Sequence, residues 1–457
     1  MQGIVGIGVF AKKIFFMNLD IFLRYFVLFF IAPVMIATAL LFSIKLKWPQ
    51  FTLFFRGIRY MMPSREKENK MSSFAAVAAI IGGNLGTGTI VGTAVALSTG
   101  GPGAIAWMIV TALLCSIVKL FCASLGVLFH EDQHNERKIG GPMFYMDKGL
   151  HFKSLAILYS IFLIGESITG GVFVQVNSFI TSFGQNIDYK WALILSLAIP
   201  SAIILFGGLK RFAKFMSFIV PIMGLFFIAA CFVGIFNLRD NLPGAIKQIM
   251  YGAIGINPII GGGIGFAITS AISTGMSRIL LAADIGLGLA GIAHANVDIH
   301  TDDIKEHARK QGIVALIAPI FVGILCAVTG ILILCSSVDM SLNGSEICIA
   351  AFNKAFNTDH AQYFIQAIIY CFSLTTILAW AWFAEHAFFY MRKSALCKIF
   401  KIFVIAIMPV GAYMHGKLPW HLADICANGL IITNIVAIIL LRKHVIELMF
   451  HDKEATI

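Results

Sequence analysis

The chain has 457 residues, of which 59% are hydrophobic and only 12% are charged, and its formal net charge is +11. Because a soluble protein carries about a quarter charged residues, this composition excludes a soluble globular protein and indicates a polytopic membrane protein. Nine Cys residues are mostly scattered through apolar runs without CxxC or Cys/His metal spacing, so we expect free apolar thiols and no metal centre or cofactor. HExxH and GxSxG patterns are absent, and we expect no catalytic residues.

Apolar runs near the length that crosses ~30 Å of hydrocarbon recur along the chain. The first run lacks a small-residue cleavage site, so we do not expect a cleavable signal peptide. The runs predict about eleven membrane helices, near 22–43, 72–98, 102–130, 155–183, 190–208, 215–236, 259–294, 308–336, 360–391, 399–414 and 420–441.

These helices divide into one extra N-terminal span and two sets of five. The segment before them is either an interfacial helix or disordered, and the sequence leaves both readings open. The predicted units are 1–21 as this first segment, 22–71 as the extra membrane helix with a loop, 72–236 as the first five-helix repeat, 259–442 as the second repeat and 443–457 as a tail.

The basic residues fall mostly on one side when the loops are assigned to alternate sides of the membrane. Cytoplasmic loops carry the excess of Lys and Arg, so we expect an outside N-terminus and a cytoplasmic C-terminus. This bias explains the positive charge without a nucleic-acid partner. The predicted cytoplasmic loops contain the basic residues within 45–70, 137–153, 210–214, 305–310, 392–401 and 442–453.

The most unusual apolar segment is 82–92, whose sequence GGNLGTGTIVG holds five glycines. Each Gly in a helix interior costs about 1 kcal/mol relative to Ala. A broken helix in hydrocarbon also leaves backbone polar groups that must be satisfied. A glycine-interrupted membrane helix therefore indicates a ligand or ion held by bare backbone, as in secondary transporters.

A second set of glycines lies in the first helix of the second half, at 261–263, Gly275 and 286–288. Matched interruptions in two halves of opposite orientation predict an inverted repeat with a binding site near the membrane midplane. The alternative is that these glycines only permit close helix packing.

Seven motifs, in order, resemble the alanine or glycine:cation symporter family, within the superfamily of leucine-transporter-like folds. The resemblance covers roughly residues 30–440. It implies an all-α polytopic membrane protein with a leucine-transporter-like 5+5 inverted repeat and one extra N-terminal membrane helix. The motifs are GTGTIVG at 86–92, GGPGA at 100–104 with Trp107, GGPMFY at 140–145, GGLKR at 207–211 with Pro221, IAHA at 292–295, KQG at 310–312, and TTILAW at 375–380 with Glu385.

The chain also departs from this family's pattern. The family's sixth helix usually reads Phe-Ser-Asn-Glu-Ala-Gly-Leu-Gly, and here Ala282 and Ala283 stand in place of the Ser and Asn. The Asn of the first motif is Thr89, and a Glu typical of the second helix is Cys122, although Lys119 remains. The chain therefore resembles a divergent member of this family, and the resemblance alone does not identify its substrate.

The resemblance and the glycine break together suggest a site for an amino acid. Backbone N–H groups beside a half-helix N-terminus suit a carboxylate, and Thr87 and Gly88 are the candidates for it. A plain packing turn is the alternative. The full set of predicted substrate residues is Gly86, Thr87, Gly88, Thr89, Gln175, Leu281, Ala282 and Asp284.

The substrate ammonium needs oxygen partners. We expect the carbonyls of Leu281 and Ala282 to provide them, together with Asp284, a carboxylate at membrane depth and thus a functional hypothesis by default. The competing reading is structural, with Arg278 pairing Asp284 or Glu166 in a plain ion pair. Asn177 likewise either faces the site beside Gln175 or satisfies a neighbouring backbone.

The resembled fold also implies a sodium site. There, a pair of adjacent hydroxyls in the eighth helix completes the ion's oxygen ligands with carbonyls of the broken first helix. Adjacent Thr residues in membrane helices also commonly bond back to their own helix, which is the alternative. The predicted sodium residues are Gly82, Leu85, Phe372, Thr375 and Thr376.

These features predict a sodium-coupled symporter for a small neutral amino acid such as alanine or glycine, working by alternating access in a bacterial inner membrane. Sodium is then the coupling ion, and the amino acid and the lipid bilayer are the partners. The open alternatives are a receptor or sensor that has lost transport, a proton-coupled transporter, and an exporter or exchanger for a different amino acid.

Overall fold

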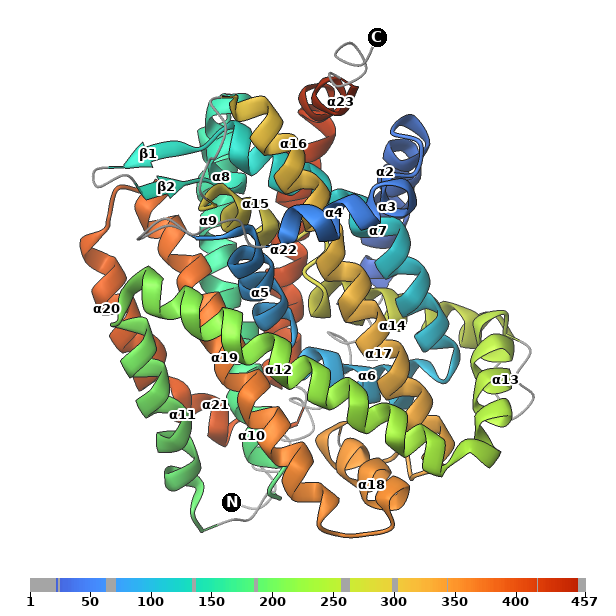
Figure 1. Cartoon of the computed structure of the whole chain (residues 1–457). Helices are drawn as coiled ribbons and strands as arrows, with labels where there is room; N and C mark the ends of the chain where they lie inside the picture. Colours follow the sequence, from blue (N-terminus) through green and yellow to red (C-terminus); the bar gives the residue numbers. More distant parts are fainter. Residues whose placement is uncertain are drawn as a thin grey trace, which may run out of the picture.

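The long helices run between two opposite ends of the molecule (Figure 1). The computed structural model describes residues 22–23, 25–62, 71–133, 137–184, 188–255, 264–297, 303–342, 344–416 and 418–450. One end carries α4 (Phe54–Met61), α16 (Ile304–Ala315), α23 (Arg442–Phe450) and the hairpin of β1 (Glu131–Gln133) with β2 (Arg137–Ile139). The opposite end carries α18 (Gly344–Phe356).

Among the described residues, eight helical stretches are long and apolar enough to cross a membrane, and a bent pair of helices makes a ninth. The pair is α5 (Ser73–Asn84) and α6 (Thr87–Gly100), bent by 40°. The eight stretches are η1 (Val27–Ile31) with α2 (Ala32–Lys45), α7 (Gly103–Leu128), α9 (Lys153–Ile168) with η3 (Thr169–Phe173) and α10 (Val174–Thr181), α12 (Gly208–Asn237), α16 with α17 (Ile317–Ser336), α19 (Ala361–Tyr390), α20 (Ala395–Ala406) with α21 (Met408–Tyr413), and α22 (Leu418–Leu440).

Two further helical elements lie at the other positions where spans are predicted. One is α11 (Lys190–Leu205), a shorter apolar helix, and the other is the interrupted pair α14 (Ile264–Ala282) and α15 (Leu289–Ala295). The predicted all-α polytopic membrane fold is therefore confirmed, with a helix at each predicted place. The remaining short elements are α3 (Pro49–Thr52), α8 (Pro142–Phe144), η2 (Tyr145–Gly149), η4 (Arg239–Asn241) and α13 (Leu242–Ala253).

Helices at the periphery expose apolar side chains, whereas the central helices bury theirs. On α12, Phe218 and Leu225 are about two-thirds exposed, while α7 and α19 are mostly buried. Apolar exposure on this scale is expected where lipid, not water, is the solvent. The exposed belt thus places the outer helices against the hydrocarbon and leaves the interior for polar groups.

Both broken helices lie at the centre, and each half of one packs against a half of the other. The first half, α5, contacts α15, and α6 contacts α14, while α7 contacts both α14 and α15. The first break falls at Leu85 and Gly86, and the second spans 283–288. Antiparallel pairing of two interrupted helices is the arrangement expected of an inverted repeat. The predicted glycine cluster at 261–263 lies outside the described residues.

The second break has a left-handed backbone at three positions. Asp284 has φ of +51°, Gly286 of +87° and Gly288 of +100°. A left-handed residue ends an α-helix because its backbone cannot continue the helical turn, and Gly adopts that conformation without a Cβ clash. At Gly288 an added Cβ would also lie 2.4 Å from Cγ of Pro142. Glycine is therefore required there both by the left-handed backbone and by the contact with Pro142.

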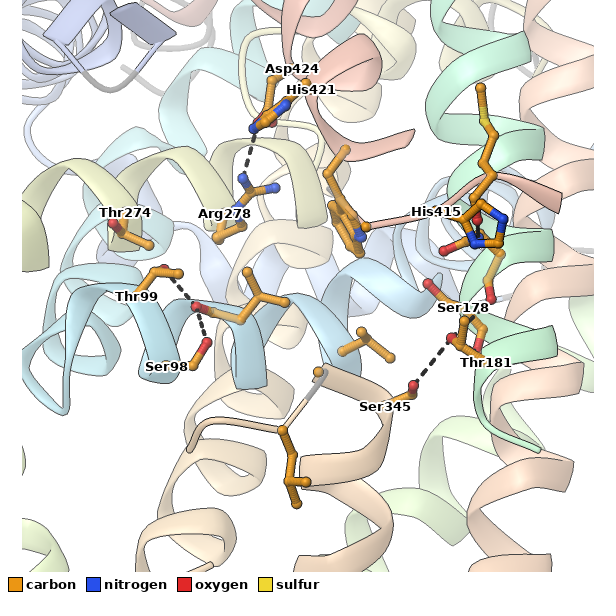
Figure 2. A pocket seen from close by; sticks show the side chains of 18 of the residues that line it. Ser98, Thr99, Ser178, Thr181, Thr274, Arg278, Ser345, His415, His421 and Asp424 are labelled. Atoms are coloured by element: carbon orange, nitrogen blue, oxygen red, sulfur yellow. Dashed lines mark hydrogen bonds and ion pairs between the residues drawn. The ribbon is translucent and has the colours of Figure 1, made fainter. Parts of the chain in front are cut away.

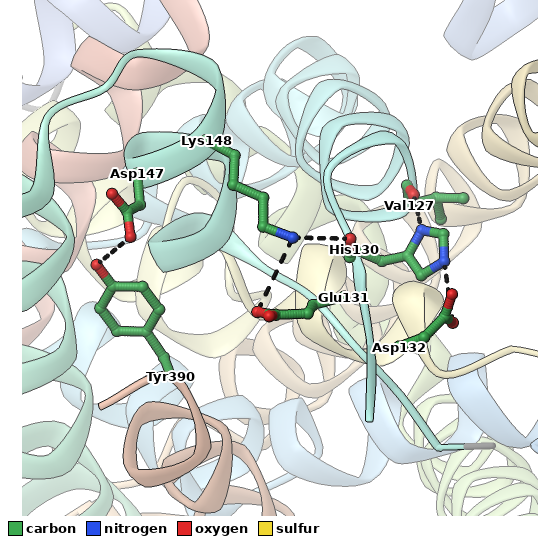
Figure 3. Close-up of polar contacts among 7 residues, drawn as sticks. All are labelled: Val127, His130, Glu131, Asp132, Asp147, Lys148 and Tyr390. Carbon is green, nitrogen blue, oxygen red and sulfur yellow. Dashed lines mark hydrogen bonds and ion pairs between the residues drawn. The ribbon is translucent and has the colours of Figure 1, made fainter. Parts of the chain in front are cut away.

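Polar contacts tie the connecting segments together at the end that carries the hairpin (Figure 3). Lys148 Nζ lies 3.9 Å from Glu131 Oε2 and donates to the carbonyl of His130. Tyr390 Oη, at the end of α19, donates to Asp147 Oδ2 at 2.9 Å. These contacts link η2 to both the hairpin and α19.

The helix α23 covers the same end of the molecule. Val445 and Leu448 are buried, and α23 packs on α7 and α16. The predicted tail 443–457 therefore begins as a packed helix, and residues 451–457 lie outside the described part of the chain. The predicted segment 1–21 lies outside it as well.

Candidate functional site

A small cavity lies between the two broken helices. Its volume is about 30 Å³, which is room for one or two water molecules. A cavity of this size is smaller than an amino acid. The lining residues come from both broken helices and from α9, η3, α10, α19 and α22: Gly83, Asn84, Gly86, Gly88, Glu166, Gly170, Val174, Gln175, Leu281, Ala282, Thr376, Trp380 and Trp420.

The N-terminus of α6 is capped by a side chain from another helix. The Thr87 backbone N–H donates to Gln175 Oε1 at 3.0 Å, and the Thr87 hydroxyl donates to the same oxygen at 3.1 Å. Gln175 Nε2 donates in turn to the carbonyl of Gly170. A helix N-terminus favours acceptor oxygens, and an amide oxygen occupies that place here. The structure thus brings Thr87 and Gln175 into direct contact.

The glycine at the first break is required by its neighbours. An added Cβ at Gly86 would lie 2.7 Å from Thr376 Oγ1 and 2.9 Å from Gln175 Oε1. At Gly88 the nearest atoms to an added Cβ are those of Ala282, at 3.8 Å. Thr89 is not among the described residues that line the cavity, and its hydroxyl donates to the carbonyl of Asn84.

The predicted sodium residues gather where α19 meets the end of α5. Thr376 Oγ1 donates to the carbonyl of Gly82 at 3.1 Å. Thr375 Oγ1 instead donates within its own helix, to the carbonyls of Cys371 and Phe372. The alternative of back-bonding therefore describes Thr375, while Thr376 makes the contact between helices. Leu85 is buried at the break itself.

On the second broken helix, Leu281 and Ala282 line the cavity, whereas Asp284 is not among the described residues that do. Its Oδ2 lies 3.3 Å from Lys119 Nζ of α7. Arg278 pairs with neither of the carboxylates considered for it, because its Nη2 donates to Asp424 Oδ2 at 3.0 Å.

Two residues missed by the sequence reasoning line the cavity with unpartnered atoms. Among the described residues, Asn84 Nδ2 and Glu166 Oε1 have no hydrogen-bond partner, although both are buried. Thr169 donates to the other carboxylate oxygen of Glu166 at 3.1 Å. A buried donor and a buried acceptor without partners are costly, which makes these two atoms candidates for contact with a ligand. The available signals were a carboxylate inside an apolar run and an Asn within the glycine-rich motif.

The local fold makes room for the Glu166 carboxylate. The chain passes from α9 into the π-helix η3 directly after it, a widening of the helix that is frequent at functional sites. An added Cβ at Gly170 would lie 2.0 Å from Glu166 Oε1. At Gly171 it would lie 2.6 Å from Cβ of Trp380. Glycine at both positions therefore lets the carboxylate and the Trp380 side of α19 approach η3.

A second, larger cavity of about 360 Å³ lies nearer the end that carries α18 (Figure 2). Its walls combine apolar side chains with many Ser, Thr, Asn and His side chains. We call it the vestibule. Arg278 and Asp424 face each other across its upper part in Figure 2, and the guanidinium lies 5.2 Å from the Trp420 ring centroid. Trp420 lines both cavities, so its ring lies between them.

Asn177, the other half of the predicted polar pair, lies in the vestibule wall. Its Nδ2 donates to the carbonyls of Gly411 and Met414 at 3.2 and 2.8 Å. It thus satisfies backbone at the end of α21, as the alternative reading expected.

The sequence pattern of the sodium:alanine symporter family matches residues 14–455. The chain belongs to this family. An uncharacterized transporter of Haemophilus influenzae is 31% identical over 428 residues, covering 91% of this chain and 92% of that protein. The amino-acid carrier protein AlsT of Bacillus subtilis is 30% identical and covers 89% and 86%. The sodium/alanine symporter AgcS of Methanococcus maripaludis is 28% identical and covers 82% of each chain.

A solved structure supports the fold of this sodium:alanine symporter family member. The manganese transporter of Eremococcus coleocola, in complex with an aromatic bis-isothiourea compound, is 11% identical with a TM-score of 0.52, and 85% of this chain and 81% of that chain are covered. The chain therefore has the predicted leucine-transporter-like fold. It is a multi-pass membrane transporter, not an enzyme.

Proposed function

We propose that this sodium:alanine symporter family member takes up a small neutral amino acid together with sodium by alternating access. One observation carries the proposal. The unpartnered donor of Asn84 and the unpartnered acceptor of Glu166 line the same small cavity. An α-amino acid offers a carboxylate and an ammonium, which match a donor and an acceptor in that order. The names of the relatives AgcS and AlsT point to the same class of substrate.

In this proposal the carboxylate binds at the N-terminus of α6. It replaces the Gln175 oxygen at the Thr87 N–H and accepts from Asn84. Helix N-termini favour carboxylates through their free N–H groups and the helix dipole. The ammonium binds to Glu166 and to the carbonyls of Leu281 and Ala282. A charge-assisted hydrogen bond to Glu166 compensates for the Ser and Asn side chains that the sixth helix lacks.

Sodium would bind beside the substrate at the first break. The carbonyl of Gly82 and the hydroxyl of Thr376 already meet there at 3.1 Å. The carbonyl of Phe372, one turn earlier on α19, accepts from the hydroxyl of the neighbouring Thr375. Hard oxygen ligands of this kind suit an alkali cation. Because substrate and ion share the same break, each would raise the other's affinity.

Access from outside would pass through the vestibule. The connecting segments that line it, at Gly184, 340–342 and 415–416, belong to the side that carries few basic residues. The positive-inside rule then places the vestibule and the N-terminus outside and α23 in the cytoplasm. A bacterial inner membrane fits this topology. Trp420 would separate the vestibule from the substrate cavity.

Uptake into proteoliposomes tests the proposal. Labelled alanine, glycine and larger neutral amino acids are supplied with an inward sodium gradient, a proton gradient or neither. We expect concentrative uptake of at least one small amino acid only with the sodium gradient. Binding without flux would indicate a receptor instead. Folded protein that neither binds nor moves any amino acid would refute the proposal.

A further inference from the structure

A buried ion pair lies at the second helix break. Lys119 Nζ of α7 is 3.3 Å from Asp284 Oδ2, and the two side chains are 1% and 0% exposed. Asp284 has a left-handed backbone with φ of +51°, an unfavourable conformation that persists only where the surroundings enforce it. Charges at this depth are expensive unless they are paired. The pair is therefore a structural requirement of the break or part of its function.

The surroundings of the pair are polar but neutral. Asn434 Nδ2 donates to the carbonyl of Gly286 at 2.7 Å, and Tyr159 Oη donates to the carbonyl of Leu287 at 2.7 Å. The carbonyls of the break are thus satisfied by uncharged groups. Among the described residues, Lys119 is the cation that pairs with Asp284.

The contact between the two groups is a close ion pair, with 3.3 Å between Lys119 Nζ and Asp284 Oδ2. A compact point charge suffices for such a contact. An ammonium and a sodium ion are alike in this respect, because both are small monovalent cations that carboxylates attract.

Lys119 is held rigidly beside the break. An added Cβ at Gly126 of α7 would lie 2.3 Å from the carbonyl oxygen of Gly291 of α15, and one at Gly291 would lie 2.8 Å from the carbonyl oxygen of Cys122. The backbones of α7 and α15 are therefore in direct contact on either side of these glycines. Because of that packing, the Lys119 charge cannot leave the break as a free ion does.

The two breaks consequently differ in how positive charge is supplied. The first break offers the neutral oxygens of Gly82 and Thr376 and needs an ion from solution. We propose that the Lys119 ammonium is a tethered cation that permanently fills at the second break the place of a mobile ion, so that a single sodium accompanies each substrate. This inference rests on the proposed sodium-coupled transport.

The sodium dependence of uptake tests the tether. The initial rate of amino-acid uptake is measured against sodium concentration for the wild type, Lys119→Gln and Lys119→Arg. We expect a Hill coefficient of about 1 for the wild type and for Lys119→Arg, and about 2 for Lys119→Gln, because the freed Asp284 carboxylate then recruits a second sodium. The sodium-to-substrate flux ratio should double in Lys119→Gln. An unchanged coefficient in active Lys119→Gln would overturn the proposal.

A binding readout covers variants that transport poorly. Thermal unfolding of purified protein in detergent is followed in sodium chloride and in choline chloride. Lys119→Gln should gain a sodium-specific stabilisation larger than that of the wild type, and Lys119→Gln combined with Asp284→Asn should lose the extra part. If sodium does not stabilise or rescue Lys119→Gln, a mobile ion cannot replace the ammonium and the tether is refuted. If the wild type moves amino acids without sodium, the proposed coupling fails, whereas a sodium response gained by Lys119→Gln still supports the tether.

Discussion

Thr375 and Thr376 are neighbours in sequence, yet their hydroxyls contact different helices. Successive residues of an α-helix point about 100° apart, and only Thr376 points toward the carbonyl of Gly82. Thr375 bonds to the carbonyls of its own helix. Their contributions to a sodium site should therefore differ.

Replacing the two residues one at a time separates these roles. We expect Thr376→Ala to raise the sodium concentration for half-maximal uptake by about tenfold, since one lost oxygen ligand is worth about 1–1.5 kcal/mol. Thr375→Ala should have a clearly smaller effect, and sodium titrations of labelled uptake give both values. Equal effects of the two substitutions would contradict the assignment of Thr376.

The Glu166 carboxylate has one oxygen bonded to Thr169 and one without a described partner. Glu166→Gln keeps its size but removes the charge. We expect the KM for the amino acid to rise at least about tenfold, because a hydrogen bond to a charged group is worth about 1.5–3 kcal/mol.

The matched control for this substitution is Glu131→Gln, in the partly exposed hairpin far from the cavity. It should leave the KM unchanged. Analogues that lack the ammonium should bind weakly to the wild type and lose little further affinity in Glu166→Gln. A normal KM in Glu166→Gln would show that the carboxylate does not contact the substrate.

At the scale of elements, the two broken helices depend on glycine for different reasons. At Gly288 the backbone is left-handed and Pro142 is in contact. At Gly86 the backbone is extended, with φ of −75° and ψ of −173°, and the constraint is the approach of α10 and α19. Glycine in the first break is thus a packing requirement between three helices.

Gly86→Ala should abolish transport while the protein still inserts and folds. The new methyl group would displace the Thr376 hydroxyl and the Gln175 amide, at 2.7 and 2.9 Å. Gly92→Ala on the same helix is the control, because its Cβ would meet only Trp420 at 3.9 Å and alanine favours helix by about 0.4–1 kcal/mol. The test compares the uptake of the two variants, normalised to the amount of folded protein. Full activity in Gly86→Ala would refute the described packing at the break.

The predicted elements agree well with the structure because their signals are local. A run of about 20 apolar residues marks a span wherever it occurs, and glycines mark the break at 82–92. The second break was harder to place. The predicted glycines extend from 261 to 288, and the described break occupies only 283–288. Asp284 takes a left-handed conformation there, which sequence composition does not reveal.

At the scale of the whole molecule, Trp420 lines both the vestibule and the small cavity between the broken helices. Arg278 stacks over its ring and pairs with Asp424. A cation–π contact of this kind is worth about 0.5–2 kcal/mol. The three side chains thus form a partition that connects α14 to α22.

Trp420→Ala should join the two cavities and weaken substrate binding. The Trp420 side chain is half-buried, so its loss costs less than the about 3–5 kcal/mol of a fully buried Trp, and we expect KM to rise about tenfold. Trp191→Ala is the control, since that ring is 56% exposed on α11. Competition binding in detergent gives affinities without the need for transport. Unaltered affinity in Trp420→Ala would rule out the partition.

The sequence by itself determined the membrane environment, the helical fold, the first break and the family, because apolar runs and glycine-rich motifs are properties of contiguous residues. Only the tertiary structure decided which polar groups meet. It directs Glu166 into the cavity, pairs Asp284 with Lys119 and pairs Arg278 with Asp424. These partners lie far apart in the chain, and their meeting depends on how each helix is rotated and packed. From the sequence alone, each buried charged residue could pair with any other of opposite sign, and only the packing of the helices determines which two meet.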